Sequence, residues 1–426
     1  MKNSGIEWIG QIPNDWNLTR SKFIAKTYTG NSIKDEQKSS YEDSENAVPY
    51  IATKNIVQAT GEIDKSDILF VKNEDISFVR AYQGDILMCI EGGSAGRKKT
   101  FLTEEVCFVN KLCCFHPTGI NPRYLYYTLQ SPHYESEFRL NLSGLIGGVS
   151  RSKLDNFTLT YPPEFVQKKI VDYLDKKCAN VDDLIAVEQA QIEKLKEYKQ
   201  SVITEVVTKG LNPDVPMKDS GVEWIGEIPA HWKTTRIKNL FELRNERNDE
   251  ADLSKVNLIS LYTDLGVVQH SDIVETTGNK AVTAEGYKLV YKNDIVVNII
   301  LCWMGAVGMS NYDGVTSPAY DIYQPKNGTL SEYYHYLFRT KRFNGECYRY
   351  GRGIMLMRWR TYSTEFTAIR IPEPPKNEQI EILSYLKKKS EQIDSLISIK
   401  QEKIEKLQVY KKSLIYEYVT GKKEVI

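Results

Sequence analysis

The sequence repeats itself, and this internal repeat constrains the fold more than any other feature. The segment Gly5–Pro13 (GIEWIGQIP) returns 216 residues later as Gly221–Pro229 (GVEWIGEIP), and a tryptophan follows each segment at Trp16 and Trp232. Self-similarity on this scale means that the chain is built from one structural unit used twice. The unit is about 210 residues long, as the spacing of its copies shows.

The two copies agree at their ends and differ in their middles. The closing segments recur with an offset of 212: Pro162, Pro163, Gln167 and Ile192–Leu195 (IEKL) return as Pro374, Pro375, Gln379 and Ile404–Leu407 (IEKL). Between the opening and closing segments the copies match poorly. A shared frame with unlike interiors indicates one architecture that presents two different surfaces.

Each copy begins with a region of α+β character. Short β-branched runs bounded by Gly, Asn and Asp predict strands. They lie at residues 48–52 and 84–90 in the first copy and at 256–262 and 294–300 in the second, with Asp85 and Asp294 in equivalent positions. A tyrosine-rich helix is predicted over 124–130 and over 333–339. We expect two similar domains of mixed strands and short helices, over residues 1–163 and 218–375.

A long polar helix follows the Pro-Pro pair of each copy, over residues 164–209 and 376–426, with a linker at 210–217. Apolar residues recur at heptad spacing in both helices. The predicted seam consists of Ile185, Ile192, Leu195, Val202, Ile397, Ile404, Leu407 and Leu414. Glu188 and Lys199 put charge where the seam favours carbon. Since a lone helix would leave its stripe exposed, we expect the two helices to pack on each other.

The sequence contains no recognisable catalytic site. The glycine-rich segment Gly92–Lys98 lacks the spacing of a nucleotide-binding loop, and both Pro-Pro pairs lack the tetrad of amino-methyltransferases. The five histidines are isolated and the seven cysteines form no CxxC pair, so we expect no metal site and free thiols in a reducing compartment. Without a signal core or an apolar run of about 18 residues, we expect a cytoplasmic protein with no membrane span.

Nucleic-acid binding would depend on local basic patches, because 56 basic and 56 acidic residues leave no net charge. The densest patch lies between Phe338 and Tyr362, where arginines and aromatic residues are interleaved. Arginine holds phosphates or reads guanine bidentately. The candidates of this patch are Arg339, Lys341, Arg342, Arg349, Arg352, Arg358 and Arg360. We expect some of these arginines to pair with acids inside the fold.

The first copy has thinner basic clusters. Arg97 and Lys98 lie beside the glycine loop, while Arg139, Arg151 and Lys153 surround Gly144, Gly147 and Gly148, where the backbone can approach a ligand closely. Lys54 and Asn55 are weaker candidates, since Asn is more often a turn residue than a base reader. Two similar domains on a helical spacer would read two half-sites of duplex DNA, commonly about 34–36 Å apart. Unlike interiors predict unlike half-sites and an asymmetric target.

The order of these segments resembles the specificity subunit of type I restriction–modification systems, over the whole chain. The resemblance rests on the GxEWIGxIPxxW opening, the variable domain, the Pro-Pro-x-x-x-Gln step and the long helix, all present twice. Residues 374–379 match the Pro-Pro-x-x-Glu-Gln step of the family fully, whereas Phe165 and Val166 depart from it in the first copy. The resemblance implies two target-recognition domains and an antiparallel coiled coil that fixes the half-site spacing.

The resemblance also implies partners. Two methylation subunits would carry S-adenosylmethionine and methylate adenine, and two restriction–translocase subunits would use ATP and magnesium, so that this chain itself binds no cofactor. Glu193, Lys194, Glu405 and Lys406 on the helices are the candidate partner contacts, although a solvated face explains them equally. The alternatives are a DNA-binding or scaffold protein of another defence system and, less in keeping with the missing motifs, a stand-alone methyltransferase or nuclease.

Overall fold

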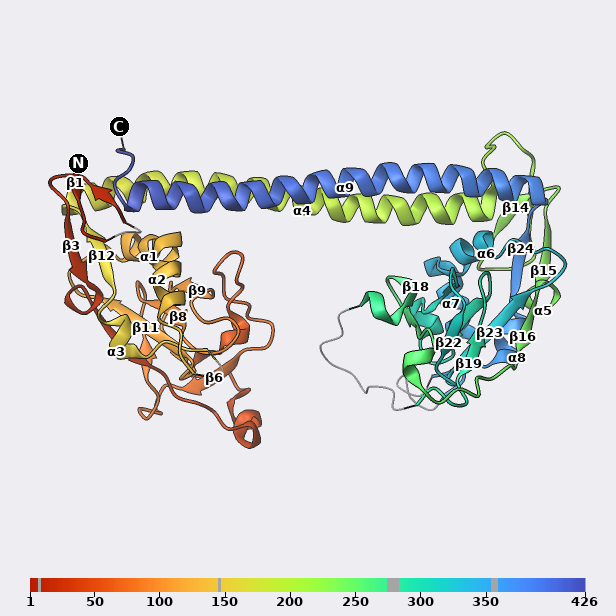
Figure 1. Ribbon diagram of the computed structural model, residues 1–426, viewed down its shortest axis with the longest axis horizontal. Coiled ribbons are helices and arrows are strands. Elements are labelled where there is room, and N and C mark those ends of the chain that lie inside the picture. Colours follow the sequence, from red (N-terminus) through yellow and green to blue (C-terminus); the bar gives the residue numbers. More distant parts are fainter. Residues whose placement is uncertain (7–8, 145–146, 274–282, 354–358, 426) are drawn as a thin grey trace. The chain divides into compact units, whose positions relative to one another are not determined.

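The computed structural model describes residues 1–426 apart from 7–8, 145–146, 274–282, 354–358 and 426. The chain forms two compact units (Figure 1). Unit 1 contains Met1–Ala190 together with Lys400–Ile426, and unit 2 contains Gln191–Ile399. Unit 1 therefore combines most of the first copy of the repeat with the end of the second copy.

Unit 1 is built around two four-stranded sheets. In the first, β4 (Ala25–Thr29), β11 (Leu112–Pro117), β8 (Ile86–Cys89) and β9 (Lys99–Phe101) lie in that order and are antiparallel. In the second, the order is β6 (Leu69–Lys72), β5 (Ala47–Ile51), β10 (Val106–Phe108) and β7 (Arg80–Ala81), with β5 and β10 parallel. Two further strand pairs complete the described strands: β1 (Lys2–Asn3) with β2 (Gln11–Ile12), and β3 (Asn17–Arg20) with β12 (Thr158–Tyr161). The short helices are α1 (Pro122–Gln130), α2 (Pro132–Leu140) and α3 (Arg151–Leu154).

Unit 2 repeats this frame with a different middle. Its four-stranded antiparallel sheet has the order β16 (Phe241–Arg244), β23 (Tyr320–Pro325), β20 (Ile295–Asn298) and β21 (Val307–Met309). The other pairs are β13 (Met217–Asp219) with β14 (Glu227–Pro229), β15 (Lys233–Arg236) with β24 (Arg370–Glu373), β17 (Ile259–Tyr262) with β18 (Gly266–Gln269) and β19 (Lys288–Val290) with β22 (Gly314–Thr316). The short helices are α5 (Ile237–Leu240), α6 (Ser331–Phe338), α7 (Lys341–Tyr350) and α8 (Ser363–Ala368).

Two long helices continue from the ends of these domains, namely α4 (Glu164–Lys209) and α9 (Lys376–Val419). In the first turn of each long helix, the side chain of the repeated glutamine bonds to the main chain just before the helix. Nε2 of Gln167 donates to the carbonyl oxygen of Pro162, and Nε2 of Gln379 donates to that of Pro374, both at 2.9 Å. The Pro-Pro-x-x-x-Gln step is thus a device that satisfies the carbonyl group just before the helix. Among the described helices, none combines the length and the apolar character that a membrane span requires.

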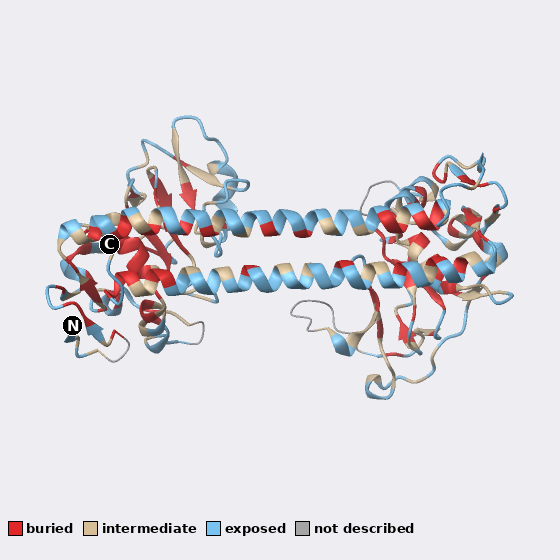
Figure 2. Ribbon diagram, turned by 90° about the horizontal axis from the view of Figure 1, so that it is seen from above, coloured by how far each residue is buried: buried red, intermediate tan, exposed pale blue. Residues whose placement is uncertain are grey.

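The long helices run antiparallel within each unit, side by side in Figures 1 and 2. In unit 1, Lys411 pairs with Asp182 and Lys403 pairs with Glu188, so positions on α9 fall as positions on α4 rise. In unit 2, Lys199 of α4 pairs with Asp394 of α9. Of the predicted seam residues, Ile192, Val202, Ile404 and Leu414 are buried, and Ile185, Leu195, Ile397 and Leu407 are half-buried. The α+β fold with two long helices in contact is confirmed.

Each opening motif packs against the end of a long helix. Gly210 ends α4 with φ +78°, and a side chain there would meet the Trp232 ring; Gly421 follows α9 with φ +67°, and a side chain there would clash with Pro13 and approach Trp16. Positive φ favours glycine at such a helix end. The motif of the second copy thus covers the end of the first helix, while the motif of the first copy covers the end of the second helix.

Candidate nucleic-acid interface

Two buried aspartates anchor equivalent strands in the two units. Asp85 and Asp294 stand just before β8 and β20, are each 1% exposed, and accept hydrogen bonds from the main-chain N–H groups of Tyr82 and Tyr291 at 2.8 and 3.0 Å. Arg244 adds an ion pair of 2.9 Å to Asp294. The predicted equivalence of Asp85 and Asp294 therefore has a physical basis, because both carboxylates hold the turn that precedes a central strand.

The far ends of these strands lead into the candidate interface. In unit 1, the main-chain N–H of Val149 donates to the carbonyl of Ile90 at 3.0 Å, and that of Gly92 donates to Gly147 at 2.9 Å. In unit 2, the N–H of Thr361 donates to the carbonyl of Ile299 at 2.9 Å. Each strand end is thus bonded to a later loop, which brings together residues that are far apart in the sequence.

In unit 1, this junction joins the two predicted basic clusters, which we call the glycine edge (residues 90–98 and 139–153, as far as they are described). Arg97, Arg139, Arg151 and Lys153 are exposed on it. Arg97 bonds to the carbonyl of Gly93 within its own loop, and Lys153 Nζ donates to the carbonyl of Asn141 at 3.1 Å. Two loops with several glycines can approach a ligand closely, and the cations around them favour a phosphate-bearing one.

The other candidates of the first copy form hydrogen bonds and an ion pair within their own domain. The amide of Asn55 is buried, accepts from the N–H of Ala52 at 2.9 Å and donates to the carbonyls of Asp64 and Asp67. Lys54 pairs with Asp67. Lys98 donates to the carbonyl of Thr53 at 2.9 Å. The hydrogen bonds of Asn55 are those of a buried turn residue.

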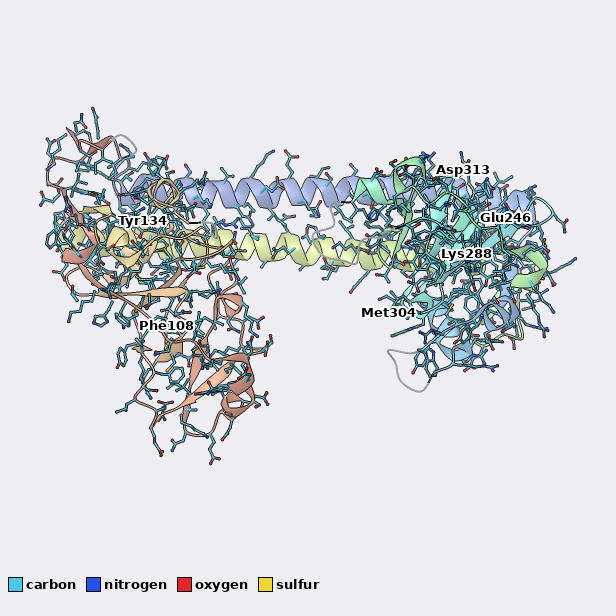
Figure 3. All side chains as sticks on the ribbon, turned by 60° about the horizontal axis from the view of Figure 1, so that its bottom comes forward. Phe108, Tyr134, Glu246, Lys288, Met304 and Asp313 are labelled. Carbon is cyan, nitrogen blue, oxygen red and sulfur yellow. The ribbon has the colours of Figure 1, made fainter. Side chains whose placement is uncertain are left out.

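In unit 2, the equivalent junction carries aromatic rings and arginines, and we call it the aromatic edge (residues 299–304 and 348–361, as far as they are described). The rings of Tyr348 and Trp359 stack with centroids 5.0 Å apart, and Trp303 meets Tyr348 edge-on at 5.7 Å. The Trp359 indole donates to the carbonyl of Tyr348 at 3.0 Å. Met304, labelled in Figure 3, is 51% exposed beside this cluster.

The arginines of the second copy fall into distinct groups. Arg339 donates to four carbonyl groups, those of Thr263, Asp264, Gly305 and Val307, and is therefore a structural clamp. Arg349 pairs with Glu346 at 2.7 Å, and Arg352, with 76% of its side chain exposed, pairs with Glu365 at 3.0 Å. Arg352 and Arg360 also exchange two main-chain hydrogen bonds. Arg358 lies outside the described residues.

Lys341 and Arg342 open onto a groove beside α4. The groove has a volume of about 660 Å³, and Lys196 and Lys209 contribute further cations to its lining. Glu197 and Glu205 are the acids of the lining. The excess of basic side chains favours an anionic ligand here as well.

Sequence reasoning missed Trp303 and Met304. Both belong to the short 3-10 helix Cys302–Met304, which directly follows the strand pattern of residues 294–300. The sequence could have pointed to them, because this segment aligns with the glycine loop of the first copy. The alignment uses the offset of 209 that relates Asp85 to Asp294. An aromatic residue at the end of an anchored strand is a candidate ligand contact.

Titratable groups in the described residues offer little for chemistry. Burial lowers the pKa of both His133 and His335 to about 4. No group of three or more His, Cys, Asp or Glu side chains in the described parts of the chain is arranged to hold a metal ion.

The long helices carry a second kind of surface, with exposed apolar residues at equivalent positions. Leu184, Val187 and Tyr198 on α4 are 49%, 51% and 48% exposed, and their equivalents at offset 212, Leu396, Ile399 and Tyr410, are 47%, 59% and 53% exposed. Glu193, Lys194, Glu405 and Lys406, the predicted partner contacts, are also exposed. The same pattern of exposed apolar side chains therefore occurs on both long helices.

Comparison with known proteins gives a consistent result. A family model described as the type I restriction modification DNA specificity domain matches residues 13–197 and 229–408. A relative from Methanocaldococcus jannaschii, described as the specificity subunit of type I restriction enzyme MjaX, is 23% identical over 437 residues, covering 97% of this chain and 95% of its own. The MjaVIII specificity subunit from the same organism is 25% identical over 246 residues, covering 55% and 51%.

The fold is also similar to that of a solved structure. A chain from a type I restriction–modification system superposes with a TM-score of 0.66 at 12% identity, covering 96% of this chain and 98% of its own. At this identity the likeness concerns the fold, and it extends over nearly the whole chain.

Proposed function

This chain belongs to the type I restriction–modification DNA specificity family, and from this premise we propose that its two domains bind the two unlike halves of a bipartite, asymmetric duplex target. As a specificity subunit it is not itself catalytic and directs its partner subunits. We assign the target-recognition domains to residues 1–163 and 218–375, the helices to 164–209 and 376–426, and the linker to 210–217.

The observation that carries this proposal is the contrast between the glycine edge and the aromatic edge. Both edges lie at the ends of equivalent strands, β8 and β20, behind equivalent aspartates. One edge offers closely approachable backbone and cations, while the other offers stacked rings and arginines. Since base readout depends on the side chains that reach the groove, equivalent positions with unlike chemistry support unlike half-sites.

We assign DNA contacts to the exposed basic residues of these edges and of the groove beside α4, namely Arg97, Arg139, Arg151, Lys153, Lys341, Arg342, Arg349 and Arg352. Phosphate oxygens would replace Glu365 as the partner of Arg352, whose side chain is 76% exposed whereas that of Glu365 is only 13% exposed. Asn55 and Arg339 are not among the proposed contacts, because their polar atoms already bond within the fold.

We assign the apolar positions of the long helices to two methylation subunits. The repeat of Leu184 and Val187 as Leu396 and Ile399 supports two identical partners. Lys194 and Lys406 lie one heptad beyond Val187 and Ile399, so they extend the same two helix faces. S-adenosylmethionine, ATP and magnesium would belong to the methylation subunits and to two restriction–translocase subunits.

The experiment is long-read methylation sequencing of DNA from cells that express this chain with a methylation subunit. We expect a two-part, asymmetric adenine-methylated motif that disappears when this chain is omitted. A variant with Arg352→Ala should lose methylation at one half of the motif, while Lys38→Ala, at an exposed surface position that pairs with Asp35, should leave the motif intact. A symmetric motif, or one that persists without this chain, would contradict the proposal.

A further inference from the structure

One charged residue lies inside the contact between the long helices of unit 1. Glu188 of α4 is 6% exposed, and its carboxylate accepts hydrogen bonds from Lys400 at 3.0 Å and from Lys403 at 2.6 Å, both on α9. These two ammonium groups keep the pKa of Glu188 below its ordinary value, Lys403 most of all. Glu188 is therefore an ionised group whose charge is compensated by the opposite helix.

The repeat places a charge of opposite sign at the equivalent position of the other helix. Lys400 stands 212 residues after Glu188, which is the offset that relates the two helices. The residue that corresponds to Glu188 in the second copy is thus also its ion-pair partner. We propose that this sign reversal selects the partner of α4: it makes α4 pair with α9 and rejects the pairing of α4 with the α4 of a second copy of this chain.

The isoleucines of the seam and its Asp–Lys pairs do not discriminate between these two pairings. Its apolar residues recur in kind, as Ile185 with Ile397 and Ile192 with Ile404 show. The other ion pairs recur too: Lys199 pairs with Asp394 in unit 2, and Lys411 pairs with Asp182 in unit 1. Because both helices carry the same Asp and Lys at these equivalent positions, two α4 helices would form those bonds as well.

Only the Glu188 position changes sign among the seam contacts described above. In a pair of α4 helices in the same register, Glu188 would face another Glu188, and in a pair of α9 helices Lys400 would face another Lys400. Like charges brought together at a partly desolvated contact are a repulsive element that confers specificity. If the proposed function holds, this element keeps one recognition domain of each kind in every particle.

The first test is a charge exchange in the full chain. We expect Glu188→Lys to lower the thermal unfolding midpoint by several degrees, because three lysines would then meet. The triple variant Glu188→Lys, Lys400→Glu, Lys403→Glu should recover most of that loss. If Glu188→Lys does not fold, Glu188→Gln gives the loss and the triple variant still gives the recovery. A triple variant as unstable as the single one would overturn the proposal.

The second test measures the choice of partner. Two differently tagged chains are refolded together at high concentration, and the amount of one tag captured through the other is compared. We expect wild type mixed with the triple variant to give about tenfold more mixed dimer than wild type mixed with wild type, because Glu188 of the wild-type α4 then meets the lysine introduced at the same position of the variant α4. Equal capture would refute the selection. Since neither readout involves DNA, both tests are independent of the proposed function.

Discussion

The hydroxyl of Tyr333 donates a hydrogen bond of 2.7 Å to the main-chain carbonyl of Val207, near the end of α4. The equivalent tyrosine of the first copy, Tyr124, donates at 3.1 Å to the carbonyl of Val419, at the end of α9. Each recognition domain is therefore fastened to the end of the helix that belongs to the other copy. Both tyrosines are fully buried, so these bonds are protected from water.

We predict that Tyr333→Phe costs about 1–2 kcal/mol of stability, since a buried carbonyl loses its donor. Tyr124→Phe should cost less, because Thr160 also donates to the Val419 carbonyl, at 2.5 Å, and keeps it satisfied. Chemical denaturation of the two variants measures the difference. Equal losses would show that the Thr160 bond does not compensate, and the double variant Tyr124→Phe, Thr160→Val then separates the two donors.

Loss of a recognition arginine should affect one half-site at a time. We expect Arg352→Ala to weaken binding to the half-site read by the second domain by about tenfold, and Arg151→Ala to weaken the other half-site to a similar extent. Binding is measured on duplexes in which one half-site is scrambled, over a range of salt concentrations. An equal loss on both duplexes with either variant would contradict the division of labour between the two domains.

The apolar positions of the helices predict a stepwise loss of partners. We expect Val187→Asp or Ile399→Asp to reduce binding from two methylation subunits to one, and the double variant to bind neither, because a charge then replaces apolar contact area. The mass of the complex in solution measures this. Both residues are more than half exposed, so folding should be unaffected. Gln401→Asp, at an exposed position on another side of α9, is the matched control.

Unit 1 contains a carboxyl group that makes stability depend on pH. Burial raises the pKa of Glu137 to about 7. The unfolded chain releases this proton near the ordinary value of 4.5 and the folded chain holds it until about pH 7, so stability falls as pH rises between these values and stays reduced above pH 7. We predict that Glu137→Gln raises stability at pH 8 by about 1 kcal/mol, allowing for its partial exposure.

At about pH 4 the Glu137→Gln variant should differ little from the wild type, because the carboxyl is then protonated in the folded chain and mostly so in the unfolded one. The variant is compared with the wild type at each pH, which cancels the opposite contribution of His133 and His335. Glu36→Gln, at an exposed position, serves as the control. A gain that is equal at low and high pH would show that ionisation is not its cause.

The elements that sequence predicted well are those determined locally. Heptad spacing predicted the long helices, and the Pro-Pro-x-x-x-Gln step predicted their starts, because both depend on residues within a few turns of one another. The roles of Asn55 and Arg339 required the fold. Arg339 looks like a DNA contact in the sequence, and its carbonyl partners at Thr263 and Gly305 come from loops that are 76 and 34 residues away.

The fit of Trp16 against Gly421 was likewise beyond sequence reasoning, since an offset between repeats does not say which copy of a helix a motif contacts. Trp16 is 4% exposed, and Trp232 is fully buried. Trp232 also donates to Glu378 at 2.9 Å, whereas the first copy has Val166 at that position.

Because the end of α9 belongs to unit 1, the two units cannot complete their cores in the order of the chain during synthesis. The core of unit 1 includes Leu414, Ile415, Tyr418 and Val419, which leave the ribosome only after all of unit 2 has been made. Unit 2 ends at Ile399 and has its whole core available earlier. The usual vectorial order, in which the N-terminal domain folds first, is therefore reversed: the first half of the nascent chain waits with an incomplete core until the second half has emerged.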